Sequence, residues 1–210
     1  PPPTSPPPPT SPPPPTSPPS LKTENVNFVA DPYGPPYMKG TSFGLQLLVP
    51  SSGIEIQSFP IPAGTYIETA ENGVHKVVVV ENNTNTSCTL SQNSFTSFKN
   101  NKGYTMYASK NFTLRYSGTE RKGHFETLEL KKGVPISYST HHQNKTYRIP
   151  FESLPNNTFI REGNTLIRTS TTGNHECVIC EIENDEFETF EPGKGYIISP
   201  SATATLISTD

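Results

Sequence analysis

The stretches FTSFKNNKGY, residues 95–104, and FETFEPGKGY, residues 187–196, decide how this chain is interpreted. They share the spacing of two Phe residues and a closing Lys-Gly-Tyr. The register between them, an offset of 92 residues, continues without a gap to Thr113-Leu114 and Thr205-Leu206. A match of this length predicts that part of the chain occurs twice.

A second pair of segments supports the repeat. IPAGTYI at residues 61–67 matches LPNNTFI at residues 154–160 with a shift of one residue. Cys88 and Cys180 also stand 92 residues apart. Because the matches occur in the same order at nearly the same offset, we expect two copies of one module. The first would cover residues 43–120 and the second residues 121–210.

Each copy contains short runs of β-branched and aromatic residues separated by turn formers. Asn72-Gly73, between residues 65–69 and 74–77, is a strong hairpin signal. The expected strands cover residues 45–49, 54–59, 65–69, 74–81, 87–90, 104–108 and 113–116 in the first copy, and 134–138, 147–151, 158–161, 165–170, 177–182, 196–198 and 204–207 in the second. About seven strands per copy, without a helical period, predict an all-β fold of two tandem β-sandwich or barrel modules.

The Lys-Gly-Tyr element has a physical logic. A turn precedes a Gly that permits close backbone approach, and the Tyr that follows begins a strand with a large ring to bury. The residues are Gly103 and Tyr104 in the first copy, and Gly195 and Tyr196 in the second. The element resembles the PGKGYW-type repeats of microbial surface and secreted proteins, although Thr105 and Ile197 replace their Trp. The resemblance implies an all-β extracellular module with no particular activity.

The first twenty residues form a separate segment of thirteen Pro with the repeating hexad PPPPTS. Pro fixes φ at about −65° and lacks an amide hydrogen, so residues 1–20 should form a polyproline II rod of roughly 60 Å. Six residues make two turns of this helix, which aligns the hydroxyl groups in stripes. The candidates for O-glycosylation are Thr4, Ser5, Thr10, Ser11, Thr16 and Ser17.

This arm resembles the hydroxyproline-rich, extensin-like segments of plant and algal wall glycoproteins, which implies secretion through a glycosylating pathway. Two other interpretations stay open: a low-complexity spacer, and a rod that docks in an aromatic groove of a neighbouring subunit. Residues 21–42, which include the turn-rich DPYGPPY at 31–37, are expected to form a linker.

Five sequons for N-glycosylation occur, at Asn82, Asn85, Asn111, Asn144 and Asn156. Asn82 and Asn85 lie in a polar hairpin tip, Asn144 in a polar stretch, and Asn156 in a turn. Asn111 enters a predicted strand, so its use requires an outward-facing side chain. In a chain secreted by a eukaryote, most of the five should carry glycan.

The three cysteines allow several arrangements. Cys177 and Cys180 are three residues apart on a predicted strand and should point to opposite faces, which argues against a zinc site with His175. A disulfide between Cys88 and Cys180, at equivalent positions of the two copies, is favoured. Cys88 with Cys177 is the alternative, and the third cysteine would be free, buried or intermolecular.

Other polar groups carry no catalytic or metal-binding signature. His141-His142 is interpreted as a surface loop, and the run ENDE at residues 183–186 lacks the spacing of a calcium loop. No Gly-x-Ser-x-Gly, P-loop or His-Glu-x-x-His motif occurs, and the carboxylates are too scattered to name a catalytic pair. We therefore expect no catalytic residue, no cofactor and no metal.

Composition narrows the function further. A net charge of −3 without a basic stripe argues against nucleic acid. No run of about 18 apolar residues could span a membrane, and a chain that begins with Pro should be a processed product or part of a longer protein. We expect a structural glycoprotein of the extracellular space or of a cell or particle surface, a filament, cell-wall or fibre subunit and not an enzyme. Its partners would be copies of itself or neighbouring subunits, and covalent glycans.

Two rival functions are a carbohydrate-binding or adhesion module on a Pro-rich stalk, and a secreted hydrolase with a Pro-rich linker. The chain has nine Tyr but no Trp, the usual platform for a sugar ring, which weighs against the first.

Overall fold

The computed structural model describes residues 20–30, 39–92, 94–120, 126–143, 147–170, 175–180 and 189–208. Their regular structure consists of strands and two short 3₁₀ helices, Ile56–Ser58 (η1) and Phe151–Ser153 (η3), which confirms the all-β prediction. None of their helices is long and apolar enough to cross a membrane. The Thr and Ser candidates of the proline-rich arm, Asn144 and the acidic run at 183–186 lie outside the described residues.

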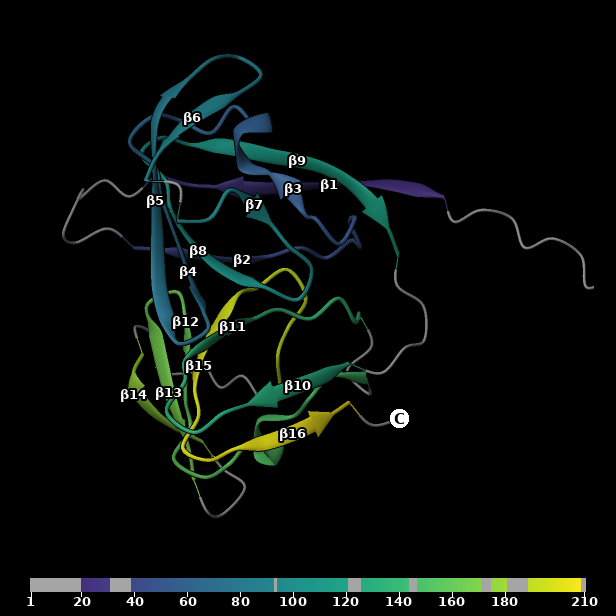
Figure 1. Cartoon of the computed structure of the whole chain (residues 1–210), viewed down its shortest axis with the longest axis vertical. Helices are drawn as coiled ribbons and strands as arrows, with labels where there is room; N and C mark the ends of the chain where they lie inside the picture. The colour runs from purple at the N-terminus through teal and green to yellow at the C-terminus, as the bar shows by residue number, and fades with distance from the viewer. Residues whose placement is uncertain are drawn as a thin grey trace, which may run out of the picture.

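The described residues between 20 and 120 form the N-terminal module. Its strands are β1 (Leu21–Phe28), β2 (Thr41–Gly44), β3 (Ile54–Glu55), β4 (Tyr66–Glu71), β5 (Val74–Asn83), β6 (Cys88–Ser91), β7 (Ser97–Phe98), β8 (Gly103–Tyr107) and β9 (Phe112–Thr119). One antiparallel sheet has the order β2-β8-β4-β5-β6, while β1 pairs with β9 and β3 with β7. In Figure 1 the long β1–β9 pair crosses the direction of β4 and β5, as in a β-sandwich.

The described residues between 126 and 208 form the C-terminal module. Its strands are β10 (Thr127–Leu130), β11 (Ile136–Tyr138), β12 (Phe159–Glu162), β13 (Thr165–Thr169), β14 (His175–Ile179), β15 (Tyr196–Ser199) and β16 (Ala204–Ile207). Its five-stranded sheet has the order β11-β15-β12-β13-β14, and β10 pairs with β16. Strand by strand this is the order found in the N-terminal module, and an isolated bridge between Pro150 and Thr189 takes the place of the β3–β7 pair.

Each module buries its own hydrophobic core, and the Tyr of the Lys-Gly-Tyr element belongs to the core in both. The rings of Phe98 and Tyr104 meet edge to face at 5.0 Å, and those of Phe190 and Tyr196 at 4.9 Å. Both Tyr hydroxyls accept a backbone N–H from five residues upstream at 2.9 Å, which ties the turn to the core. Burial raises the pKa of both Tyr residues.

The hairpin predicted at Asn72-Gly73 is confirmed, because β4 and β5 pair from Glu71 and Val74 outward. Asn72 and Gly73 have φ values of 52° and 79°, as a two-residue type I′ turn requires. The equivalent hairpin, β12–β13, turns at Gly163, whose φ is 57°. Different residues thus produce the same tight connection in the two modules.

Three of the sequence-based assignments were wrong, the linker and two predicted strands. The predicted linker, residues 21–42, contains all of β1, which pairs with β9 over eight residues, and its Phe28 is buried beside Phe43 and Phe112. The segment LKTENVNF is mostly polar because only one face of the β1–β9 pair is covered, so its residues did not predict a strand. The predicted strand at residues 147–151 has only an isolated bridge at Pro150, and helix η3 begins at Phe151. Residues 45–49 are partly or fully buried, but they pair with a strand only through the bridge between Leu48 and Thr119.

Candidate functional site between the two modules

The two modules contact one another through the glycines of their Lys-Gly-Tyr elements. A Cβ added to Gly103 would lie 2.5 Å from the amide nitrogen and 2.8 Å from the carbonyl oxygen of Tyr196. A Cβ added to Gly195 would lie at the same two distances from the same atoms of Tyr104. Only Gly permits backbones to approach this closely. We call this contact region the seam.

Backbone hydrogen bonds cross the seam in a reciprocal pair. Gly44 N–H donates to the carbonyl of Gly193 at 3.0 Å, and Ser139 N–H donates to the carbonyl of Asn101 at 3.2 Å. Gly44 is the last residue of β2, and Ser139 directly follows β11, so the two donors hold equivalent positions. The two acceptors, Asn101 and Gly193, both lie in the turn before the Lys-Gly-Tyr glycine. The modules are therefore related by an approximate two-fold axis, with equivalent surfaces facing each other.

An ion pair joins equivalent strands across the seam. Arg161 of β12 donates to Glu68 of β4 at 2.6 Å, and Tyr107 donates its hydroxyl to the same carboxylate at 3.0 Å. Burial opposes the charge of Arg161, but the carboxylate of Glu68 outweighs it and raises the pKa of Arg161. Two residues of like charge at these positions would repel each other, so the pair of opposite charge favours this arrangement.

A cavity of about 620 Å³ opens at one end of the seam, and both modules line it. The N-terminal module contributes the start of β1, which includes Lys22 and Glu24, together with Gln46 and Glu120. The C-terminal module contributes the segment of residues 141–143 and Tyr147. Lys22 and Glu120 form an ion pair at the exposed rim. This is the strongest candidate site in the described part of the chain.

The C-terminal wall of the cavity rests on a buried carboxylate. Glu126, 2% exposed, accepts the backbone N–H of His141 at 3.0 Å and the hydroxyl of Tyr138. Arg148 donates to the carbonyls of His142 and Gln143, at 3.1 and 2.8 Å. His141 and His142 are therefore buried, at 2% and 4% exposure, and the prediction of a surface loop was wrong. The polar sequence around them did not indicate these partners, Glu126 fifteen residues before His141 and Arg148 six residues after His142.

The corresponding segment of the N-terminal module is held differently. There the hydroxyl of Tyr116 in β9 accepts the backbone N–H groups of Gln46 and Leu47, at 2.8 and 3.3 Å. Ser208, which follows β16, is the counterpart of Tyr116. Its side chain is too short to reach the backbone N–H of His141, so Glu126 accepts that hydrogen bond instead. The approximate symmetry therefore gives the cavity two chemically different walls.

The N-glycosylation candidates are spread over the outer surface. Asn82, Asn85, Asn111 and Asn156 are all exposed. The first two lie at the tip of the β5–β6 hairpin, where the Thr84 hydroxyl accepts two backbone N–H groups and orders the turn. Asn111 accepts the N–H of Ala30 through Oδ1 at 2.8 Å, and its Nδ2, the atom that carries a glycan, takes no part in this hydrogen bond. Exposure makes these four Asn side chains accessible to a glycosylating enzyme.

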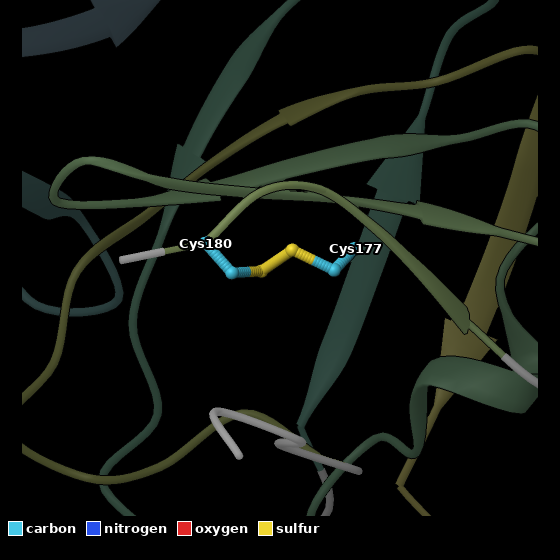
Figure 2. Close-up of a disulfide and its surroundings, with 2 residues drawn as sticks. All are labelled: Cys177 and Cys180. Carbon is cyan, nitrogen blue, oxygen red and sulfur yellow. A yellow bond between two sulfur atoms is a disulfide. The ribbon is translucent and has the colours of Figure 1, made fainter. Parts of the chain in front are cut away.

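The predicted Cys88–Cys180 disulfide, and its alternative Cys88–Cys177, were both wrong. Cys177 and Cys180 bond to each other, with their Cα atoms 6.0 Å apart and both side chains on the same side of the chain (Figure 2). The cause is an irregularity in β14: Ile167 pairs with Cys177 and Leu166 with Ile179, so Val178 is an extra residue. A bulge of this kind reverses the alternation of side chains and brings positions three apart onto one face.

Cys88 is free and buried at 4% exposure in the N-terminal core. Its thiol donates to the carbonyl of Ile56 at 3.5 Å, and burial raises its pKa. The thiol is therefore expected to be unreactive in the folded chain.

The described residues contain no group of three or more His, Cys, Asp or Glu side chains that could hold a metal ion. A smaller hollow of about 190 Å³ lies on the N-terminal module between Glu71, Lys102 and Tyr104. A hydrogen bond from Lys76 and the charge of Lys102 lower the pKa of Glu71. That hollow lies among charged side chains at the surface, whereas one wall of the seam cavity is hydrogen-bonded to the buried side chains of Glu126 and Arg148.

Comparison with known proteins adds no relative. No protein-family model matches the chain, no curated protein is similar to it, and none of the solved structures matches it. The function must therefore be argued from the residues and their arrangement.

Proposed function

We propose that this chain is a structural glycoprotein of the extracellular space or of a cell or particle surface, without catalytic activity. The observation that carries the proposal is the seam. Two β-sandwich modules are joined through close backbone contacts, reciprocal hydrogen bonds and the Glu68–Arg161 pair. Such a joint produces one stiff building unit, which suits a subunit of a filament, cell wall or fibre.

We further infer that the modules arose by duplication. Matching sequence segments at a near-constant offset, the same strand order and the same Tyr-to-backbone hydrogen bond at Tyr104 and Tyr196 support this. A duplicated unit offers similar outer surfaces at both ends, which favours association with further copies. The Lys-Gly-Tyr element would then be the device that joins modules within a chain.

The proline-rich arm and the sequons supply the glycoprotein part of the proposal. The hexads of residues 1–20 favour an extensin-like, O-glycosylated rod, and four exposed sequon Asn residues are available on the folded modules. Glycans at the β5–β6 tip would lie at the end of β5 opposite Gly73, whose N–H bonds to Pro135 of the other module. They would therefore leave the seam unobstructed.

The test is intact-mass spectrometry of the chain isolated from its own source, before and after enzymatic and chemical deglycosylation. We expect a mass well above 23.0 kDa that falls towards this value as glycans are removed. Sedimentation velocity of the same sample should show assemblies that grow with concentration. An unmodified mass together with a monomer at all concentrations would contradict the proposal.

A second candidate function, a carbohydrate-binding module on a stalk, is favoured by the polar cavity at the seam. Its mouth is lined by amide, carboxylate and aromatic side chains from both modules.

A further inference from the structure

The seam cavity has a wall that is fixed before any ligand arrives. Every residue from Thr140 to Gln143 makes a hydrogen bond to a partner that is buried: the Thr140 hydroxyl accepts the N–H of His142 at 3.1 Å, Glu126 accepts that of His141, and Arg148 holds two carbonyls. Burying a carboxylate and a guanidinium is costly unless both are well bonded. A segment ordered in this way loses little entropy when a ligand binds.

The cavity offers hydrogen-bonding groups of both kinds. Gln143 donates to the Oε1 of Gln46 at 3.2 Å across the seam, which leaves an amide NH₂ on Gln46 and a carbonyl oxygen on Gln143 for other partners. Glu24 of β1 is half-buried at the cavity, and within the described residues no hydrogen bond or ion pair engages its carboxylate. A half-buried carboxylate accepts hydrogen bonds from neighbouring O–H groups well.

An aromatic ring completes the set. Tyr147 lies against His142 with ring centroids 5.6 Å apart and planes inclined by 30°, so its orientation is fixed by a buried neighbour. Aromatic rings with a polar edge suit ligands that are apolar on one face and hydroxylated around the rim. A saccharide ring has this character.

The charge of the lining selects among ligands. Glu24 and Glu120 outnumber Lys22, and Lys22 is already paired with Glu120. Phosphate, sulfate and carboxylate ligands would therefore be repelled, and the described residues form no metal cluster. The cavity volume of about 620 Å³ falls in the usual range for small-ligand sites, about 300–1,000 Å³.

We propose that the seam cavity binds a neutral saccharide. Glu24 and the two Gln amides hold its hydroxyl groups, and Tyr147 contacts the face of its ring. Both modules contribute, so the site exists only when the seam is closed. The inference rests on the second candidate function, the carbohydrate-binding module, and names its ligand class; the structural function can hold or fail independently of it.

Titration calorimetry and saturation-transfer NMR on the full chain test the proposal. The probes are neutral gluco-, galacto- and manno-oligosaccharides, uronic-acid oligosaccharides, and the polyamine spermidine. We expect binding of at least one neutral probe and none of the acidic ones. Binding only of uronic acids or of spermidine, or no binding at millimolar concentration, would overturn the proposal.

Matched variants locate the site. Glu24→Gln and Tyr147→Leu should each weaken binding at least fivefold. Glu129→Gln, an exposed carboxylate on β10, and Tyr66→Leu, an exposed ring on β4, should leave it unchanged. Circular dichroism and the unfolding midpoint establish that each variant is folded. Equal loss in the control pair, or full binding in both cavity variants, would refute the assignment to the seam.

Discussion

Replacing Gly195 by Ala should weaken the seam by about 1–3.5 kcal/mol. The added Cβ would lie 2.5 Å from the amide nitrogen and 2.8 Å from the carbonyl oxygen of Tyr104, which are backbone atoms that cannot rotate away. Separating the strands costs about 1–3 kcal/mol, and losing the nearby Gly44–Gly193 hydrogen bond costs about 1 kcal/mol more. Ala also stiffens the unfolded chain, which offsets about 0.4–1 kcal/mol.

The assay is urea unfolding of the full chain, followed by circular dichroism and by Tyr fluorescence, since the chain has no Trp. Gly103→Ala should behave like Gly195→Ala, because the two contacts are reciprocal. The double variant should lose less than the sum, since opening the seam once relieves both clashes. With the seam weakened, the two cores should also unfold in separate transitions.

Gly133→Ala is the control for the backbone. Its φ is 70°, but no heavy atom lies within 4 Å of the added methyl group. Only the cost of a left-handed conformation is expected, about 1–2 kcal/mol, with a single transition retained. The reasoning about the seam would be refuted by a Gly195→Ala chain whose free energy of unfolding stays within about 0.5 kcal/mol of the parent.

Three further predictions concern side chains. Arg161→Glu should destabilise the seam by placing two carboxylates together, and the exchange Glu68→Arg with Arg161→Glu should restore most of the loss in urea unfolding. The pKa of Glu71 is lowered in the folded state, so the stabilisation by its carboxylate is present above the unfolded pKa of 4.5 and is lost as pH falls through the folded pKa. Glu71→Gln should therefore reduce the free energy of unfolding by under about 1 kcal/mol at neutral pH. In acid, the free energies of unfolding of the variant and the parent should become equal. Reducing Cys177–Cys180 opens a ring of only four residues and should cost at most about 2 kcal/mol in the same assay, while alkylation under native conditions labels both of these cysteines and spares Cys88.

Short-range patterns in the sequence predicted most strands of the modules. Asn72-Gly73 determined a hairpin because its two positive φ values are locally favourable. Tyr104 was expected to bury its ring because a turn and a Gly lead directly into its strand, and the ring is buried against Phe98. Strand β1 could not be predicted, since its mostly polar residues become a strand only by pairing with β9, more than eighty residues later.

The site depended on contacts of the same long-range kind. His141 and His142 looked like surface residues because the sequence does not show that Glu126 and Arg148 bury with them. The cysteine pairing was mispredicted because one extra residue, Val178, reverses the side-chain alternation of β14, and a bulge is visible only in the pairing with β13. Both errors arose where a contact formed only in the folded chain decided which way a side chain points.

The sequence by itself determined an all-β chain, its hairpin at Asn72-Gly73 and the core role of the Lys-Gly-Tyr tyrosines, because these follow from residue preferences over a few positions. Tertiary structure alone decided that Gly103 and Gly195 face each other's modules, that Glu68 meets Arg161, and that a polar cavity opens between them. The physical reason is distance along the chain. Backbone approach, ion pairing and burial between residues about ninety positions apart depend on how two completed sheets dock, and no local preference encodes that.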